Sequence, residues 1–150
     1  MTLYKFILLI HIFSAIIGLG PGFVLTYIAM HAKTMTELRH AYYIRKKVHI
    51  FVTVGGTLLL VTGVIMGILR PGLFTEIWFT LSLILYLIAL ALAPLLLISR
   101  TKPIKKILKD HKGDDIPEAY NVAARELFFY EHFTNAILAL IIVLMILKPF

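Results

Sequence analysis

Three histidines lie within the apolar stretches of this sequence, and their side chains could bind a metal. They are His11, His49 and His132, whereas the other three histidines stand among charged residues. An ionisable side chain within a membrane span normally faces the bundle interior, a cavity or a partner. Imidazole is a ligand of haem iron, and a chain without cysteine has no thiolate to compete with it. The three residues predict a haem b site serving electron transfer, haem handling or a membrane oxidoreductase.

The depth of each histidine decides which of them could share one haem. Counting about 1.5 Å per residue from the middle of its span, His49 lies about 13 Å toward the predicted cytoplasmic side. By the same count His132 lies about 8 Å toward that side, and His11 about 8–9 Å toward the other. We therefore expect His49 and His132 to be an axial pair, with His11 in a second site. The alternative for each is a neutral imidazole hydrogen-bonded to a neighbouring carbonyl or hydroxyl.

Two polar residues next to His132 could act on it. Glu131 and Asn135 are one turn apart on the same flank of the fourth span. They could fix the tautomer of a ligating histidine from the second coordination shell, or carry protons. The alternative is that Glu131 anchors the helix at the interface by pairing with a cation.

Small residues follow the same helix faces as the histidines. The glycines concerned are Gly18, Gly22, Gly56 and Gly63. Small residues let membrane helices approach closely, so packing is the first interpretation. The second is that these faces leave space for a flat macrocycle, which makes the four glycines candidate cofactor-binding residues.

Four apolar stretches must position these side chains. The chain is 60% hydrophobic with a mean hydropathy of +0.91, and a span needs about 20 helical residues. The stretches lack the alternation of barrel strands, so the spans are helices. We predict an all-α membrane protein, one four-span transmembrane domain over residues 1–150 folded as an up-down bundle. The spans are Leu3–Met30, Val48–Leu69, Ile77–Ile98 and Leu127–Leu147.

Lysine and arginine gather in two of the connections. The first loop holds five and the third holds seven, while the second loop and each end hold one. The positive-inside rule then places both loops in the cytoplasm of a bacterial cell, with both termini outside the inner membrane. The net charge of +7 indicates topology and contact with anionic lipid headgroups of the bilayer, and not nucleic-acid binding.

The first loop contains a helix start. Thr34 followed three residues later by Glu37 matches a capping box. We expect the second helix to begin near Met35, in the cytoplasm, and to end at residues 70–72, where Pro and Gly stop it.

The third loop contains an apolar pattern and a break. Ile104, Ile107 and Leu108 stand at helical spacing among lysines, which predicts a short amphipathic piece at the headgroup surface. Asp114 or Asp115 could then cap the fourth helix, with Pro117 in its first turn. The second and fourth helices would thus extend together into the cytoplasm. The ion pairs that could form there join Glu118, Glu126 or Glu131 to Arg39, Arg45 or Arg125.

The first span resembles that of a family of small bacterial integral membrane proteins of unknown function. The residues that carry the likeness are Lys5, His11, Gly18, Gly20 and the Thr62–Gly63 pair. That family is distantly similar to the copper-resistance D proteins and to the HemJ-type protoporphyrinogen oxidase. The resemblance implies a haem b site in a four-helix membrane bundle with His11 essential.

The sequence departs from the HemJ type at two places. Residues 25–27 stand where that type has an arginine and bulky aromatics, and the last two spans hold no lysine. The chain also shows no Met-x-Met tract for copper. The oxidase activity is therefore not carried over, and whether the chain is an enzyme is left open.

Two other functions fit the same residues. The chain could be a cofactor-free accessory or assembly subunit that packs through its glycine faces, in a homo-oligomer or a larger membrane complex. It could also be a small proton-linked transporter that uses His11 and Glu131.

Overall fold

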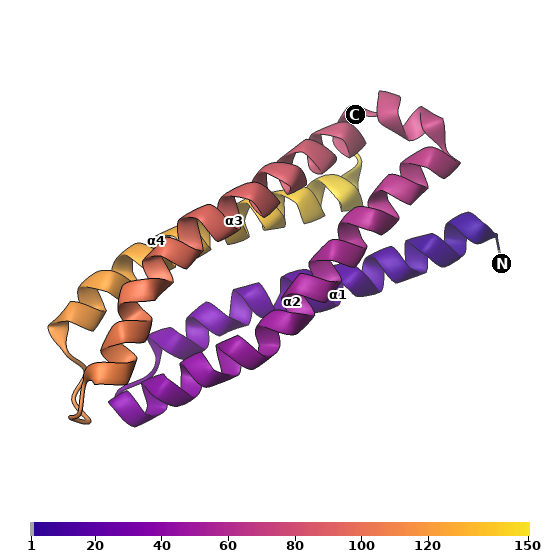
Figure 1. Cartoon of the computed structure of the whole chain (residues 1–150). Helices are drawn as coiled ribbons and strands as arrows, with labels where there is room; N and C mark the ends of the chain where they lie inside the picture. The colour runs from indigo at the N-terminus through magenta and orange to yellow at the C-terminus, as the bar shows by residue number, and fades with distance from the viewer. Residues whose placement is uncertain (1) are drawn as a thin grey trace.

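The computed structural model describes residues 2–150, and within them the chain is helical without strands. Every long helix is long and apolar enough to span a membrane, which confirms the predicted all-α four-helix membrane fold. Both ends of the chain lie at one end of the bundle (Figure 1). The elements are α1 (Leu3–Met30), α2 (Met35–Leu69), the short 3-10 helix η1 (Pro71–Thr75), α3 (Ile77–Asp110) and α4 (Glu118–Leu147).

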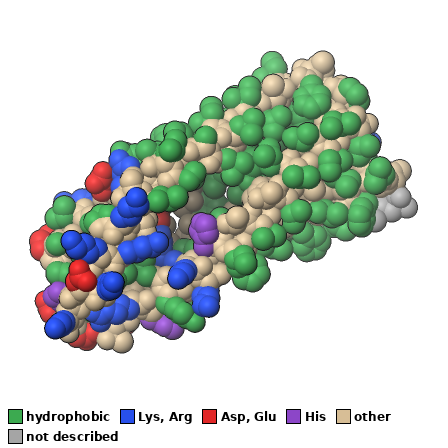
Figure 2. Space-filling model, in the orientation of Figure 1, with side chains coloured by type: hydrophobic (Ala, Val, Ile, Leu, Met, Phe, Trp, Pro, Cys, Tyr) green, Lys and Arg blue, Asp and Glu red, His purple; other side chains and the backbone are tan. Residues whose placement is uncertain are grey.

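The opposite end of the bundle carries most of the charge. It holds the α1–α2 turn at residues 31–34 and the α3–α4 turn at residues 111–117, and we call it the basic end. Figure 2 shows blue and red side chains gathered there, while the rest of that face is mainly hydrophobic. This distribution is what a bilayer around the apolar part of the bundle requires.

The bundle consists of two helix pairs, α1 with α2 and α3 with α4, which contact each other less closely than the helices within each pair (Figure 1). In the first pair the backbones touch. A Cβ added to Gly18 would lie 2.6 Å from the backbone nitrogen of Gly56, and one added to Gly55 would lie 2.5 Å from that of Gly18. Only glycine permits this approach, because neither backbone can move aside as a side chain could.

Two buried apolar clusters join the pairs. One, the basic-end core, lies near the two turns, and the other, the central core, lies deeper in the bundle. The basic-end core is formed by Met35, Leu38, Ile104, Tyr120, Ala124 and Leu127, and the central core by Leu19, Leu59, Tyr86 and Ile141. α2, α3 and α4 contribute to both cores, whereas α1 contributes only Leu19, to the central core.

The predicted boundaries of α2 are confirmed. The helix begins at Met35, and the hydroxyl of Thr34 accepts a hydrogen bond from the backbone N–H of Glu37 at 3.2 Å. It ends at Leu69, directly before Arg70 and Pro71.

The prediction of a separate amphipathic piece at 104–108 is wrong. α3 runs without a break through Pro94 and Pro103 to Asp110. Ile104 is fully buried in the basic-end core, and its burial among three helices offsets the hydrogen bonds that the prolines remove. α3 therefore extends beyond its apolar span, as α2 and α4 do.

The predicted role of Asp114 as a cap for α4 is also wrong. α4 begins at Glu118 after Pro117, with no side-chain cap. The Asp114 carboxylate instead accepts hydrogen bonds from the backbone N–H and the hydroxyl of Thr36, at 3.0 and 2.8 Å, and its carbonyl accepts one from the N–H of Met35 at 2.9 Å. The free amides at the start of α2 thus find their acceptor on the α3–α4 turn. The two hydrogen bonds from Thr36 lower the pKa of the Asp114 carboxyl.

Replacing Gly18 by alanine should destabilise the first helix pair by about 1–3 kcal/mol, because the new methyl group would overlap backbone atoms. Thermal unfolding in detergent, followed by far-UV circular dichroism, measures the change. Gly20 is the matched control, since a Cβ there would meet nothing within 4 Å. Gly20→Ala should leave stability unchanged or raise it by up to ~1 kcal/mol, and equal losses in both variants would contradict the backbone contact.

Replacing Asp114 by asparagine should speed amide hydrogen exchange at the start of α2, since the charged acceptor for Thr36 is lost. In the unchanged chain the lowered pKa means that this cap stabilises the folded state at neutral pH. The stabilisation should disappear as the pH falls below 3.8, the ordinary value for aspartate. Asp110→Asn, at the other side of the turn, should leave exchange at residues 35–37 unaltered.

Candidate functional site

His11 is half-buried between α1 and α2. Its Nδ1 lies 2.8 Å from the hydroxyl of Thr62, which itself donates to the carbonyl of Leu58 at 2.6 Å. Because that hydroxyl proton is already used, the imidazole donates from Nδ1, and its Nε2 is free to accept a proton or a ligand. A Cβ on Gly63 would lie 3.3 Å from the ring, so this glycine makes room for the imidazole.

The other two candidate ligands lie at the surface. His49 is exposed, and its Nδ1 is 3.3 Å from the hydroxyl of Thr53 on the same helix. His132 is also exposed, and it makes no side-chain hydrogen bond to any residue between 2 and 150. The structure therefore does not bring the expected axial pair together in a buried site.

The remaining glycines on the predicted faces are next to protein atoms. A Cβ on Gly56 would lie 3.1 Å from the hydroxyl of Tyr86, and one on Gly22 would lie 3.2 Å from Oδ1 of Asn135. The described part of the chain contains no group of three or more His, Asp or Glu side chains arranged to hold a metal ion. These faces serve helix packing in the structure.

The most concentrated polar chemistry surrounds Glu131, whose side chain is only 10% exposed. One carboxylate oxygen accepts a hydrogen bond of 2.6 Å from the hydroxyl of Thr26 on α1. The carboxylate also forms an ion pair with the guanidinium of Arg45 on α2, one of the predicted pairings. Glu131 therefore binds both helices of the opposite pair, and it makes no hydrogen bond to His132.

A fourth residue, Asn135, completes this arrangement one turn further along α4. Its amide donates to the carbonyl of Gly22 at 3.0 Å, next to Pro21 in α1. We refer to Thr26, Arg45, Glu131 and Asn135 as the polar layer. It lies between the basic-end core and the central core in the order of residues along α2 and α4.

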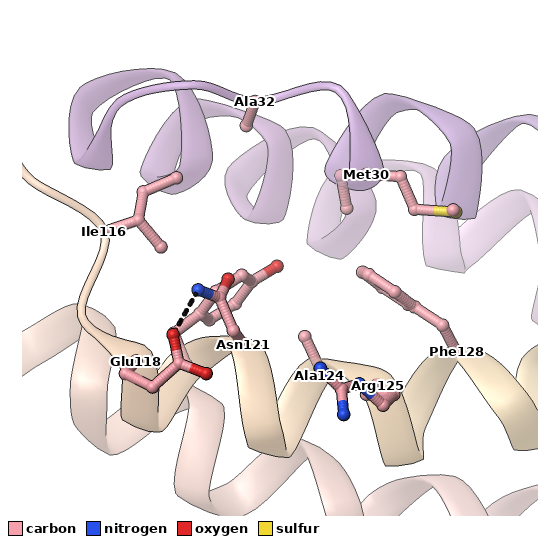
Figure 3. Close-up of a pocket in the computed structure, with 10 residues that line it drawn as sticks. Met30, Ala32, Ile116, Glu118, Asn121, Ala124, Arg125 and Phe128 are labelled. Atoms are coloured by element: carbon pink, nitrogen blue, oxygen red, sulfur yellow. Dashed lines mark hydrogen bonds between the residues drawn. The ribbon is translucent and has the colours of Figure 1, made fainter.

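The polar layer leads toward an open cleft. The hydroxyls of Tyr42 and Tyr120 are 3.3 Å apart, and the ring of Tyr42 lies 5.1 Å from the guanidinium carbon of Arg45. Tyr120 lines a cleft of about 410 Å³ between the end of α1 and the start of α4 (Figure 3). Two phenols thus lie between this cleft and the buried ion pair.

Several polar contacts join one helix pair to the other. They join α4 to α1 and α2 through the polar layer, α2 to α3 through the hydroxyl of Tyr86 and the carbonyl of Gly56 at 2.8 Å, and α2 to the α3–α4 turn through Asp114. Within the first pair, by contrast, glycine backbones pack directly. Charge and hydrogen bonding therefore add to the two apolar cores in joining the pairs.

The sequence analysis missed three members of this site. Thr26, Tyr42 and Tyr120 gave no metal-ligand or capping signal, since a threonine or tyrosine near the end of a span is common in interfacial belts. Thr26 stands four positions after Gly22, on the same helix face. This spacing was the one local sign that its side chain faces another helix.

Replacing Glu131 by alanine should destabilise the folded bundle by about 3–5 kcal/mol, because Arg45 would stay buried without a partner. Glu126→Ala is the control, since that carboxylate is 60% exposed in its pair with Arg100 and should cost about 0–1 kcal/mol. The double variant Arg45→Met with Glu131→Leu should recover most of the lost stability. Unfolding in a detergent series measures all three, and a tolerated Glu131→Ala alone would contradict the role of the ion pair.

Comparison with known proteins agrees with a membrane protein of undetermined activity. No curated protein and no solved structure matches the chain. A family model described as predicted integral membrane protein (DUF2269) matches residues 5–149. With its four membrane-spanning helices and a match along nearly its whole length, the chain belongs to this family of predicted integral membrane proteins.

Proposed function

We propose that this integral membrane protein is a small proton-linked transporter in which Glu131 is the proton-carrying group. The observation that supports this is the single buried carboxylate held by both helices of the opposite pair, through Thr26 and Arg45. Ionisable residues inside membrane bundles typically mark ion pathways and proton relays. Arg45 is the counter-charge of this carboxylate.

The two helix pairs provide the moving parts. With Glu131 ionised, the polar layer holds α4 against α1 and α2. Protonation removes the negative charge and leaves the guanidinium of Arg45 unpaired, so the attraction between the pairs at this level is lost. The pairs then separate as bodies around the central core, because the direct backbone contact of Gly18 with Gly56 keeps the first pair rigid. Rocking of helix bundles around a fixed site is the usual form of alternating access.

The path of the proton fits the geometry of the basic end. Tyr120 lines the open cleft, and its hydroxyl is 3.3 Å from that of Tyr42. Tyr42 in turn lies under Arg45, the partner of Glu131. At the far side of the bundle His11 holds a free Nε2 and a hydroxyl partner, Thr62, which makes it the second group able to take up a proton.

The haem b hypothesis has less support from the geometry. Of the three candidate ligands only His11 is half-buried, and the glycine faces are next to protein atoms. Figure 2 shows one histidine at the edge of a hollow on the face in view. A flat cofactor bound to it would lie in an open position and not in a buried site. The haem b site and the distant similarity to the copper-resistance D and HemJ-type proteins both stay predictions.

Spin labels can test the separation of the pairs without a known substrate. The chain has no cysteine, so labels placed by Ile50→Cys on α2 and Leu95→Cys on α3 are specific, and both positions are exposed. Glu131→Gln removes the charge of the carboxylate as protonation would, so the distance between the labels should be larger in this variant than in the unchanged chain. The control labels Ile98→Cys and Phe129→Cys lie within one pair and should stay at a constant distance. An equal distance between the pairs in the unchanged chain and in Glu131→Gln would contradict the proposal and favour an accessory subunit.

An absorption spectrum of the purified protein tests the haem alternative. We expect the purified protein to contain no haem and to show no Soret band. Adding haem should produce no Soret band that is lost when a histidine is replaced. A Soret band that disappears in His11→Ala, or in His49→Ala together with His132→Ala, would replace the transporter proposal by a cytochrome-like function.

A further inference from the structure

The cleft at the basic end has two chemically different walls. Met30 and Ala32 come from the end of α1 and its turn, while Asn121, Arg125 and Phe128 come from α4 (Figure 3). Its volume is about 410 Å³, and it is open to the surroundings of the bundle. It is therefore large enough for a polar headgroup and the first part of a chain attached to it.

The cleft lies at the level where the bundle passes from charged to apolar. Arg125 and Asn121 precede the apolar stretch of α4, whereas Phe128 is in the first turn of that apolar stretch. Met30, on the facing wall, is the last residue of α1 and is exposed. A ligand here would meet polar groups on one side and apolar side chains on the other, which is the arrangement at the boundary between lipid headgroups and acyl chains.

Arg125 differs from the other arginines of the basic end. Arg39 donates to the carbonyls of Leu108 and His111, Arg45 pairs with Glu131, and Arg100 pairs with Glu126. Arg125 is exposed and forms no hydrogen bond or ion pair with any other residue of the described chain. Its guanidinium therefore has all its donors available for a ligand.

The one acidic residue of the cleft is already engaged. A carboxylate oxygen of Glu118 accepts a hydrogen bond of 3.1 Å from the amide of Asn121 (Figure 3). Its charge still opposes an anion, but the twelve Lys and Arg side chains of the two basic connections outnumber the six Asp and Glu side chains there. The electrostatic balance of this end favours a negatively charged ligand.

We infer that the cleft binds one anionic phospholipid. Its phosphate accepts hydrogen bonds from the guanidinium of Arg125, and its acyl chain lies along Met30 and Phe128. Basic pockets between helices on the cytoplasmic side of membranes are typical sites for such headgroups, and the planar guanidinium binds phosphate with two parallel hydrogen bonds. Because neither Arg125 nor Met30 belongs to the polar layer, this inference does not depend on the transporter proposal.

Native mass spectrometry of the full chain in detergent tests the site, with phosphatidylglycerol and phosphatidylcholine as probes. The unchanged chain should retain one phosphatidylglycerol more strongly than phosphatidylcholine. Arg125→Gln should weaken retention about fivefold, and Glu118→Gln should strengthen it. Lys105→Gln is the matched control, because it removes the same charge from an exposed position of α3 outside the cleft and should change retention little.

Three outcomes would overturn the inference. Equal loss in Lys105→Gln and Arg125→Gln would show a diffuse electrostatic effect, and equal retention of both lipids would exclude recognition of charge. Displacement of phosphatidylglycerol by inorganic phosphate at equal concentration would show that the cleft recognises free phosphate and not a lipid. Met30→Asn supplies a further check, since it should weaken retention of the lipid while leaving any binding of inorganic phosphate unchanged. Far-UV circular dichroism of every variant confirms that the helices are intact.

Discussion

The association of the two helix pairs depends on the carboxylate of Glu131. It lies between two apolar cores, accepts a hydrogen bond from Thr26 and forms an ion pair with Arg45. A charge at this position is tolerated only when its partner and its hydrogen bonds are complete, because a lone charge in an apolar bundle costs several kcal/mol or shifts its protonation. No polar side-chain atom buried in the described chain lacks a hydrogen-bond partner. The contact is thus stable while complete and sensitive to the loss of either charge.

The contact between α1 and α2 differs in kind from the contact between the two helix pairs. At Gly18, Gly55 and Gly56 the backbones of α1 and α2 meet with no side chain between them. The pairs meet through hydrogen bonds and one ion pair, together with two apolar cores of moderate size. In a bilayer, where apolar packing between helices gains little over packing against lipid, the polar contacts decide how firmly the halves are joined. Loss of one charge in the polar layer would therefore weaken the contact between the pairs and leave the backbone contact within the first pair in place.

The basic end combines structural and binding roles on the same surface. Asp114 closes the α3–α4 turn onto the start of α2, and Arg39 donates to carbonyls at the end of α3. Together with the ion pairs of Arg45 and Arg100, they engage three of the four arginines of this end. Arg125 is the fourth arginine, with its donors free in the described chain, and it lines the cleft, which is why the inferred site for a lipid phosphate is the cleft and not the basic end as a whole.

The sequence by itself determined the helical spans, the limits of α2 and the Arg45–Glu131 pairing as one of several options, because hydropathy, capping boxes and Pro-Gly stops act over a few residues. It also placed small residues on the faces that pack. Only the tertiary structure decided that Ile104 is buried, that Asp114 caps α2 rather than α4, and that His49 and His132 are exposed. Those outcomes depend on the rotation and separation of helices that are distant in sequence. Helical periodicity gives a face for each residue but does not say which neighbour, or how much lipid, that face will meet.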